Sequence, residues 1–416
     1  MTPASAFSSP LLVRGPDHLS VAVPYLVGFY PHASLVVVGL LADSQRVGLT
    51  LRVDLPADPH QPSTPAEWHQ VAAVLEGSEC TAAVVLVYPP DSEDPFTDHH
   101  IELPRRQCVD ALTDVLCDHD IAVLDTLCVV GQRLRSYGCS DLVCCPTGGR
   151  TPNPEIVSRL TASFVADGVA PLPSRTHLEQ QLEARELTDP LCQQISAERD
   201  AVILRLPAGE VRRVQGFVED LRALAAEPHR RAGLVRLVIT AEELCSTIRA
   251  RDLLLREITI DSDRGLLSAA REVLSEAVRC VPGYVGAQLA AVLAICAWVS
   301  GDGAAGRIAV TRSLTLDPDC SLALLVDEVL DRGLPPATWR ALVNDLTTEQ
   351  ILGTEQILGT EQPPHLSPPD LSVPASPPSQ HDMAVPSPVR SSPRGHMPEV
   401  LPTVGIGGLA SDGQQD

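Results

Sequence analysis

Lysine is absent from this chain of 416 residues, so all 31 basic side chains are arginine. An arginine guanidinium stays protonated in proteins and has no lone pair with which to accept a proton. The absence therefore excludes a lysine Schiff base, a lysine general base and the phosphate-binding lysine of a P-loop.

Aromatic side chains are also scarce, at 3% of residues. Proteins that bind single-stranded nucleic acid stack its bases on aromatic rings beside a basic groove. This chain instead carries a formal net charge of −22, which repels a phosphate backbone. We therefore expect no nucleic-acid partner.

The sequence contains no apolar run of the length that a membrane-spanning helix needs. The longest run, residues 287–299, falls short of the roughly 20 residues that cross the hydrocarbon core. The first residues, MTPASAFSSPLLVRGPDH, lack the basic and apolar regions of a secretory signal. These features predict a cytoplasmic protein with no membrane span, whose twelve scattered cysteines are mostly reduced.

Residues 11–170 alternate between strand and helix patterns. Residues 35–41 form a nearly unbroken apolar run, and residues 46–55 alternate at period two after a short polar turn, which predicts a β-hairpin. Further strands are expected at residues 80–89 and 121–130, with helices between them. Strands that alternate with helices predict an α/β domain, and the hairpin makes its sheet mixed.

From residue 171 onward the pattern is helical. Residues 171–264 form a connecting region in which the stretch DAVILRLP, residues 200–207, also fits a strand. Residues 265–346 contain four helical stretches separated by short breaks at Gly or Pro. These hairpins fit a tetratricopeptide-like array or a plain helical bundle equally well.

The last segment, residues 347–416, is expected to be a disordered tail. It starts with a duplicated hexapeptide, TEQILGTEQILG, and continues rich in Pro, Ser and Gly without periodicity. Four Ser-Pro steps, at Ser367, Ser376, Ser387 and Ser392, are candidate phosphorylation sites.

The stretch VPYLVGFYPHASLVVVGLL, residues 23–41, joins an early helix to the hairpin. We expect Asp17 to cap this helix and Gly28 to close it in a left-handed turn. Phe29 and Tyr30 are then expected to pack beneath the strand that follows. This folding role is favoured over a ligand-binding turn, because the segment offers little charge to hold a ligand.

The same stretch carries a family resemblance. VRGPDHLSVAVPYLVGFYPHASLVVVGL, followed by RSYGCSDLVCCPTGG and IRARDLLL in that order, resembles an actinobacterial family known as domain of unknown function 4192. The resemblance runs from about residue 11 to residue 343. It implies a cytoplasmic actinobacterial protein and supplies no activity and no catalytic residue.

The strongest chemical candidate is a group of cysteines, Cys139, Cys144 and Cys145, with Cys128 eleven residues earlier. Thiolates at such spacing can share one zinc ion if a turn brings them together. Against a metal site, the chain has no CxxC pair, so structural thiols or a redox pair are the favoured interpretation. No other cofactor is expected.

Three weaker patterns favour structural roles. GDGAAG, with Gly301, Gly303 and Gly306, matches the dinucleotide fingerprint only in letters, because a helix precedes it. DSDRG, residues 261–265, reads as a turn with a helix cap and not as a calcium loop. His99 and His100 lie in an acidic loop that is expected to be solvated.

With no convincing catalytic set, the sequence favours a non-enzymatic role. We expect an interaction or scaffold protein that binds a protein partner through the helical region. The alternative is an enzyme or a metal or thiol sensor centred on Cys139 to Cys145.

Overall fold

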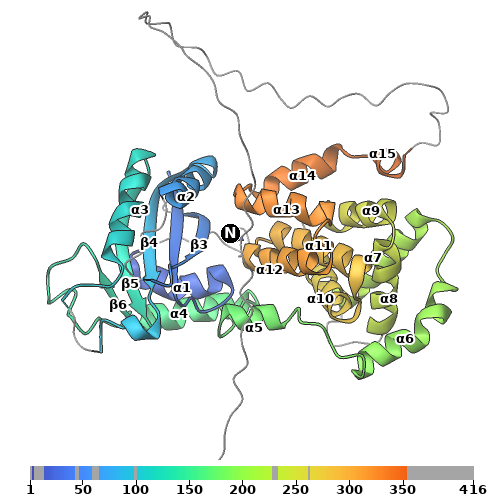
Figure 1. Cartoon of the computed structure of the whole chain (residues 1–416), viewed down its shortest axis with the longest axis horizontal. Helices are drawn as coiled ribbons and strands as arrows, with labels where there is room; N and C mark the ends of the chain where they lie inside the picture. The colour runs from blue at the N-terminus through green and yellow to red at the C-terminus, as the bar shows by residue number, and fades with distance from the viewer. Residues whose placement is uncertain are drawn as a thin grey trace, which may run out of the picture. The chain divides into compact units, whose positions relative to one another are not determined.

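The computed structural model describes residues 2–3, 14–42, 46–58, 65–97, 101–226, 233–260 and 263–353, all within one compact unit, Met1–Ile357. Figure 1 shows a sheet flanked by helices in the first part of this unit and only helices from α5 onward. The predicted architecture, a mixed α/β region followed by an all-α region, is confirmed. The four Ser-Pro steps and the predicted tail from residue 354 on lie outside the described residues.

The α/β region contains six strands and four α-helices among its described residues. In chain order these are β1 (Thr2–Pro3), α1 (Pro16–Val27), β2 (Ser34–Leu41), β3 (Val47–Asp54), α2 (Pro65–Gly77), β4 (Cys80–Tyr88), α3 (Arg106–Asp118), β5 (Ala122–Val130), β6 (Arg133–Ser136) and α4 (Pro154–Ala166). A short 3-10 helix, Asp91–Glu93, follows β4.

The strands form one sheet in the order β1-β3-β2-β4-β5-β6. β2 pairs antiparallel with β3, as the predicted hairpin requires, and also antiparallel with β4. β4 and β5 are parallel, and α3 makes the crossover that parallel neighbours need. β5 turns directly into β6, which pairs with it antiparallel and was not expected from the sequence. The sheet is therefore mixed, as predicted.

Helices cover both faces of the sheet, which explains why β2 is apolar at nearly every position. Leu35 and Val37 face α2 and α3, whereas Val36 and Val38 face α1 and α4. A strand buried on both faces reads as a continuous apolar run instead of an alternating one. Figure 1 shows α1 and α4 on the side of the sheet opposite α2 and α3.

The segment around α1 corrects two expectations and confirms two. Gly28 closes the helix in the left-handed region, with φ +86°, and Phe29 is buried. Asp17 does not cap the helix: α1 begins one residue earlier, and the carboxylate accepts hydrogen bonds from Arg150 and from the backbone N–H of Asn153. Tyr30 is 54% exposed, because its side chain leaves the layer that Phe29 enters.

The helical region contains eleven helices among its described residues. They are α5 (Arg175–Gln180), α6 (Pro190–Ile203), α7 (Glu210–Ala226), α8 (Leu234–Cys245), α9 (Ile248–Thr259), α10 (Arg264–Cys280), α11 (Gly283–Val299), α12 (Gly303–Leu316), α13 (Ser321–Asp331), α14 (Pro336–Asp345) and α15 (Thr348–Leu352). One hydrophobic core joins side chains from Leu182 to Leu330. Residues on both sides of residue 264 therefore share a core.

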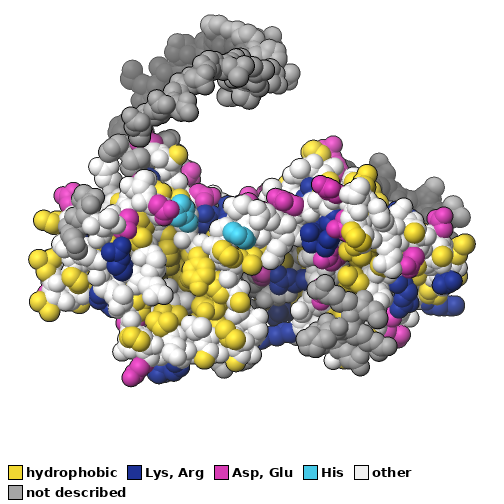
Figure 2. Space-filling model, turned by 90° about the horizontal axis from the view of Figure 1, so that it is seen from below, with side chains coloured by type: hydrophobic (Ala, Val, Ile, Leu, Met, Phe, Trp, Pro, Cys, Tyr) yellow, Lys and Arg dark blue, Asp and Glu magenta, His cyan; other side chains and the backbone are white. Residues whose placement is uncertain are grey.

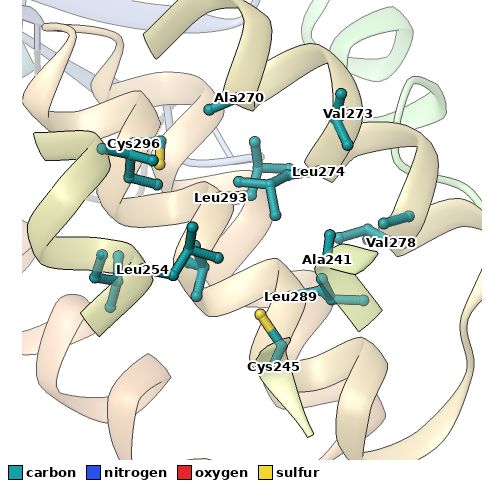
Figure 3. Packing of buried hydrophobic residues seen from close by; sticks show 14 of the residues in the cluster. Ala241, Cys245, Leu254, Ala270, Val273, Leu274, Val278, Leu289, Leu293 and Cys296 are labelled. Carbon is teal, nitrogen blue, oxygen red and sulfur yellow. The ribbon is translucent and has the colours of Figure 1, made fainter. Parts of the chain in front are cut away.

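Helix α11 lies at the centre of this region. It packs against α8, α9, α10, α12, α13 and α14, and every side chain from Ala287 to Val299 is buried. Figure 3 shows side chains of α8, α9 and α10 meeting those of α11. At Gly306 of α12, a Cβ atom would lie 3.3 Å from the carbonyl oxygen of Ala294. A central helix of this kind belongs to a bundle, since in an open solenoid each repeat contacts only its neighbours.

Two segments differ from their predicted structure. The stretch at residues 200–207 is not a strand: its first half ends α6, which starts at Pro190 after Asp189 caps it by accepting from the N–H of Leu191. The first copy of the hexapeptide repeat forms α15, and Ile351 and Leu352 pack against the helical core. Ordered structure thus continues into the segment that was expected to be tail from residue 347.

Charged side chains of both signs are interspersed over the face that Figure 2 shows. Many arginines pair with carboxylates, including Arg105 with Glu93 and Arg150 with Asp17. Within the described residues, no helix combines the length and the apolar character that crossing a membrane requires.

Candidate metal centre

The three clustered cysteines lie in the loop between β6 and α4, and the start of this loop is fixed to α3. Tyr137 is buried, and its hydroxyl donates to the carbonyl oxygen of Pro104 at 2.6 Å. The Arg106 guanidinium lies over the Tyr137 ring and donates to the Tyr137 carbonyl oxygen at 2.9 Å. The backbone that leads into Cys139 is therefore held in place.

The end of the loop is anchored as firmly as its start. Leu134 and Arg150 exchange two backbone hydrogen bonds, of 2.9 and 3.0 Å, so the chain returns to β6. The Arg150 side chain pairs with Asp17 of α1. Asn153 then caps α4 by accepting from the N–H of Glu155. Both ends of the loop are thus attached to the α/β region.

A single turn inside the loop brings the thiols together. The Asp141 carboxylate accepts from the N–H of Val143 at 2.8 Å, and its backbone carbonyl accepts from the N–H of Cys145 at 2.7 Å. As a result, the Sγ atoms of Cys139, Cys144 and Cys145 all lie within 4.8 Å of one another. Among the described residues, this is the one group of three or more His, Cys, Asp and Glu side chains so placed.

The three thiols differ in their exposure to solvent. Cys145 is buried, Cys139 is half-buried and Cys144 is exposed. Val143, at the tip of the turn, is 93% exposed. An ion or a reagent can therefore reach the group from the side of Cys144, while Cys145 fixes it to the protein.

Burial raises the pKa of the Cys145 thiol to about 11, and its neighbours Cys139 and Cys144 add to this rise. A backbone hydrogen bond from Ser136 acts in the opposite direction. The buried thiol is therefore protonated at neutral pH when no cation is present. A divalent ion reverses this balance, because metal ligation deprotonates cysteine.

Cys128 does not join the group, contrary to the suggestion that it completes a set of four ligands. It is fully buried in β5 on the face of the sheet that α2 and α3 cover. Burial raises its pKa to about 12, and a hydrogen bond with Tyr137 partly offsets this. Side chains alternate between the two faces along β5: Leu127 and Val129 face α1 and α4, so Cys128 between them points into the core on the other face.

The geometry of the three remaining thiols fits a tetrahedral ion. Three thiolates about 2.3 Å from one zinc ion lie about 3.8 Å apart, so small side-chain rotations bring these Sγ atoms into range. The fourth position is left to a water molecule or to an exogenous ligand. Sites with three protein ligands and one open position are the ones at which zinc can exchange ligands.

The weaker patterns of the sequence take the structural roles expected for them, where they are described. GDGAAG links α11 to α12, and Asp302 caps α12 by accepting from the N–H of Ala305. Asp263 caps α10 in the same way, at Gly265 and Leu266. Residues 98–100 and 261–262 lie outside the described residues, so His99, His100 and Asp261 are not placed.

Residues 16–337, from the start of α1 to the start of α14, match the family described as Domain of unknown function (DUF4192). No curated protein and no solved structure matches this chain.

Proposed function

This chain belongs to the family described as Domain of unknown function (DUF4192), and we propose that it is a metal-dependent thiol sensor. The proposed ion is zinc, bound by Cys139, Cys144 and Cys145. The observation that carries the proposal is the convergence of three Sγ atoms within 4.8 Å in a loop anchored at both ends. Clustered free thiols on a loop are otherwise hard to account for by packing alone, since Cys144 is exposed.

Sensing follows from the chemistry of the ligands. Hydrogen peroxide oxidises two of the three zinc-bound thiolates to a disulfide: the thiolates give up two electrons, and the peroxide takes these and two protons from solvent to become two water molecules. One cysteine is then left, and a single thiolate does not retain zinc. The exposed Cys144 is the point of attack, because reactivity follows thiolate character and access.

The test measures zinc in full-length protein purified without oxygen. The unaltered chain is expected to hold close to one equivalent of zinc more than Cys144→Ser, because this change removes one ligand of the thiol site. Cys117→Ser is the matched control, because Cys117 is an exposed thiol on α3. Cys128→Ala should also retain zinc, since Cys128 lies outside the group. A zinc content that Cys144→Ser leaves unchanged would refute the proposal.

A second candidate function is protein interaction through the helical region. A cavity of about 400 Å³ lies between α9, α13 and α14 and is lined by Trp339, Leu322 and Leu325. Leu325 is 65% exposed, and Leu324 and Leu342 are exposed as well. Large apolar side chains that gather beside a cavity are typical of a surface that binds a protein.

This second candidate is tested with point changes, because removal of residues 265–345 would also remove most of the core that holds α7 to α9. Leu325→Asp should abolish capture of a partner that the unaltered chain retains. Leu204→Asp is the control, since Leu204 is 85% exposed and lies at the end of α6. Equal capture by both variants would count against a role for this surface.

We further infer a cytoplasmic location and no nucleic-acid partner. All twelve cysteines are free, which suits a reducing compartment, and a net charge of −22 disfavours binding to phosphate backbones. Fractionation of the native host would test the location: recovery outside the cytoplasm would overturn it.

A further inference from the structure

A chain of three polar side chains joins α2 to the end of α3. His69 and Glu76 lie two turns apart on α2, and His119 follows the last residue of α3. His69 Nδ1 lies 3.2 Å from His119 Nε2, and His119 Nδ1 lies 3.2 Å from a carboxylate oxygen of Glu76. None of these contacts belongs to the thiol group described above.

Glu76 determines how His119 presents its second nitrogen. An ionised carboxylate accepts hydrogen bonds only, so the proton of a neutral His119 lies on Nδ1 and the lone pair lies on Nε2. That lone pair faces the Nδ1 atom of His69. A carboxylate that accepts from one ring nitrogen while the other nitrogen ligates an ion is the arrangement that commonly orients metal-binding histidines.

We propose that His69 Nδ1 and His119 Nε2 bind one divalent transition-metal ion with a preference for nitrogen ligands, with Glu76 as a positioning residue. Zn–N bonds are about 2.0–2.1 Å long. Two nitrogens 3.2 Å apart then subtend about 100° at the ion, which is close to the tetrahedral angle of zinc. The ion replaces the proton that the two rings otherwise share, and water completes its coordination.

The two helices that carry the pair pack into one core, which holds the backbone of both histidines in place. Trp68 and Leu75 of α2 and Leu116 of α3 are buried in one core beneath the two helices. The rings themselves remain reachable, since His69 is exposed and His119 is only partly buried. Exposed carboxylates at Glu79, Asp118 and Asp120 surround the end of the helices, and such negative charge raises the local concentration of cations.

The experiment titrates zinc into the full chain by calorimetry near neutral pH. The reference chain carries Cys139→Ser, Cys144→Ser and Cys145→Ser, so the proposed thiol site does not contribute and the two proposals are tested separately. The reference is expected to bind one equivalent of zinc. His69→Ala and His119→Ala should each abolish this binding, and Glu76→Gln should weaken it by about 10- to 100-fold.

His177→Ala provides the matched control, because His177 is an exposed histidine on α5 that bonds locally to Ser174. It should bind zinc as the reference does. Helical content measured by circular dichroism identifies any variant that fails to fold. Because the His69 side chain is exposed to solvent, His69→Ala is the variant expected to disturb folding least. A reference chain that binds no zinc, or a folded His69→Ala chain that binds it unchanged, would overturn the proposal.

Discussion

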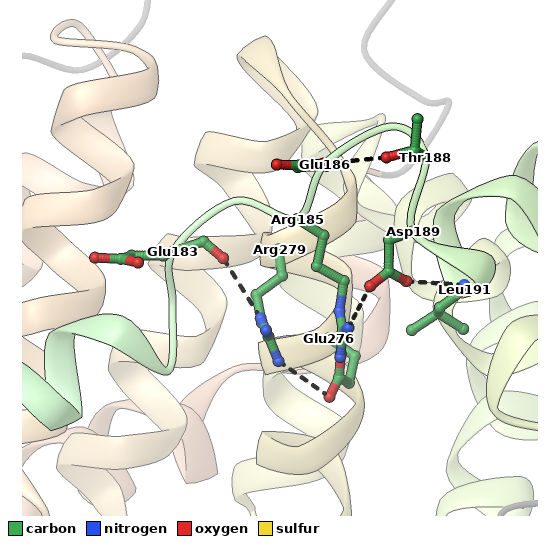
Figure 4. Close-up of polar contacts among 8 residues, drawn as sticks. All are labelled: Glu183, Arg185, Glu186, Thr188, Asp189, Leu191, Glu276 and Arg279. Carbon is green, nitrogen blue, oxygen red and sulfur yellow. Dashed lines mark hydrogen bonds and ion pairs between the residues drawn. The ribbon is translucent and has the colours of Figure 1, made fainter.

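Arg185 donates two hydrogen bonds to one carboxylate oxygen of Glu276, at 2.7 and 3.1 Å, and so attaches the segment before α6 to α10. Its remaining terminal nitrogen donates to Asp189, which caps α6. The backbone N–H of Arg185 also donates to the carbonyl oxygen of Arg279 at 2.8 Å. Figure 4 shows this network, in which one arginine connects a loop, a helix cap and a helix of the core.

Replacement of this arginine should destabilise the fold. Arg185→Ala is expected to lower the free energy of unfolding by about 1–2 kcal/mol, because Glu276 loses its main charged partner while only partly exposed. Arg332→Ala is the control: its pair with Glu328 is exposed on both sides, and its loss should cost less than about 0.5 kcal/mol. Urea unfolding of both variants compares the two values. Equal losses would show that the Arg185 network is no more than a surface pair.

Two glycines should respond to alanine in opposite directions. At Gly286 of α11 a Cβ atom would lie 2.1 Å from the carbonyl oxygen of Val281, so Gly286→Ala is expected to cost about 2–3 kcal/mol. Gly216 lies inside α7 with open space at its Cβ position. Gly216→Ala should therefore stabilise the chain by about 0.5–1 kcal/mol through helix propensity. Thermal unfolding, monitored by circular dichroism at α-helical wavelengths, measures the stability of both variants. A Gly286→Ala chain as stable as the unaltered chain would contradict the close contact between α11 and the Val281 carbonyl oxygen.

Buried thiols should make the protein sensitive to alkaline pH. Burial raises the pKa of Cys245 and of Cys296 to about 12, against 9.0 for an exposed thiol. Because the folded pKa is the higher one, the stabilisation is complete below pH 9 and is lost as the pH rises from about 9 to about 12. Each thiol then contributes a slope of up to about 1.4 kcal/mol per pH unit.

This alkaline slope is measured by urea unfolding at a series of pH values. Cys245→Ala removes one titrating group and should flatten the slope, whatever it does to stability at neutral pH. Cys117→Ala, at an exposed position on α3, should leave the slope unchanged. The same slope in both variants would mean that Cys245 ionises as readily in the folded chain as in the unfolded one.

Zinc binding at the thiol group should release protons. The Cys145 thiol has its pKa raised to about 11 and must lose its proton to ligate the ion. The apparent affinity should therefore rise by about tenfold per pH unit for each proton released. Competition with a chromophoric chelator at several pH values measures this slope in a His69→Ala chain, in which the thiol group is the remaining proposed zinc site. An affinity independent of pH would argue that thiolates are not the ligands.

Much of the fold follows from local patterns in the sequence. The period of two in residues 46–55 and the apolar run before it gave the correct hairpin, and the breaks at Gly and Pro placed α10 to α13 correctly. The centre of the helical region was also readable, since residues 287–299 are apolar all round and a helix of that kind must be buried. Asp17 was assigned the wrong role because its partner, Arg150, lies 133 residues away.

The candidate sites show the same limit. Cys139, Cys144 and Cys145 fall within seven residues, so one turn can unite them and the sequence indicated the group. The exclusion of Cys128 depends on the face of the sheet on which it lies and on the packing of α2 and α3 over that face, which no local pattern reveals. His69 and His119 are 50 residues apart and belong to no motif, so only the packing of α2 on α3 identifies them as a pair.

The burial of α11 on all sides also constrains how this half of the protein can diverge in sequence. From Ala287 to Val299, no face of the helix offers solvent into which a larger side chain could turn. A larger side chain at Ala294 would have to be matched by a smaller side chain on a facing helix. Gly306 of α12 faces Ala294 and has no side chain that could be made smaller. Its small residues therefore set the distance between helices, and changes there must come in compensating pairs.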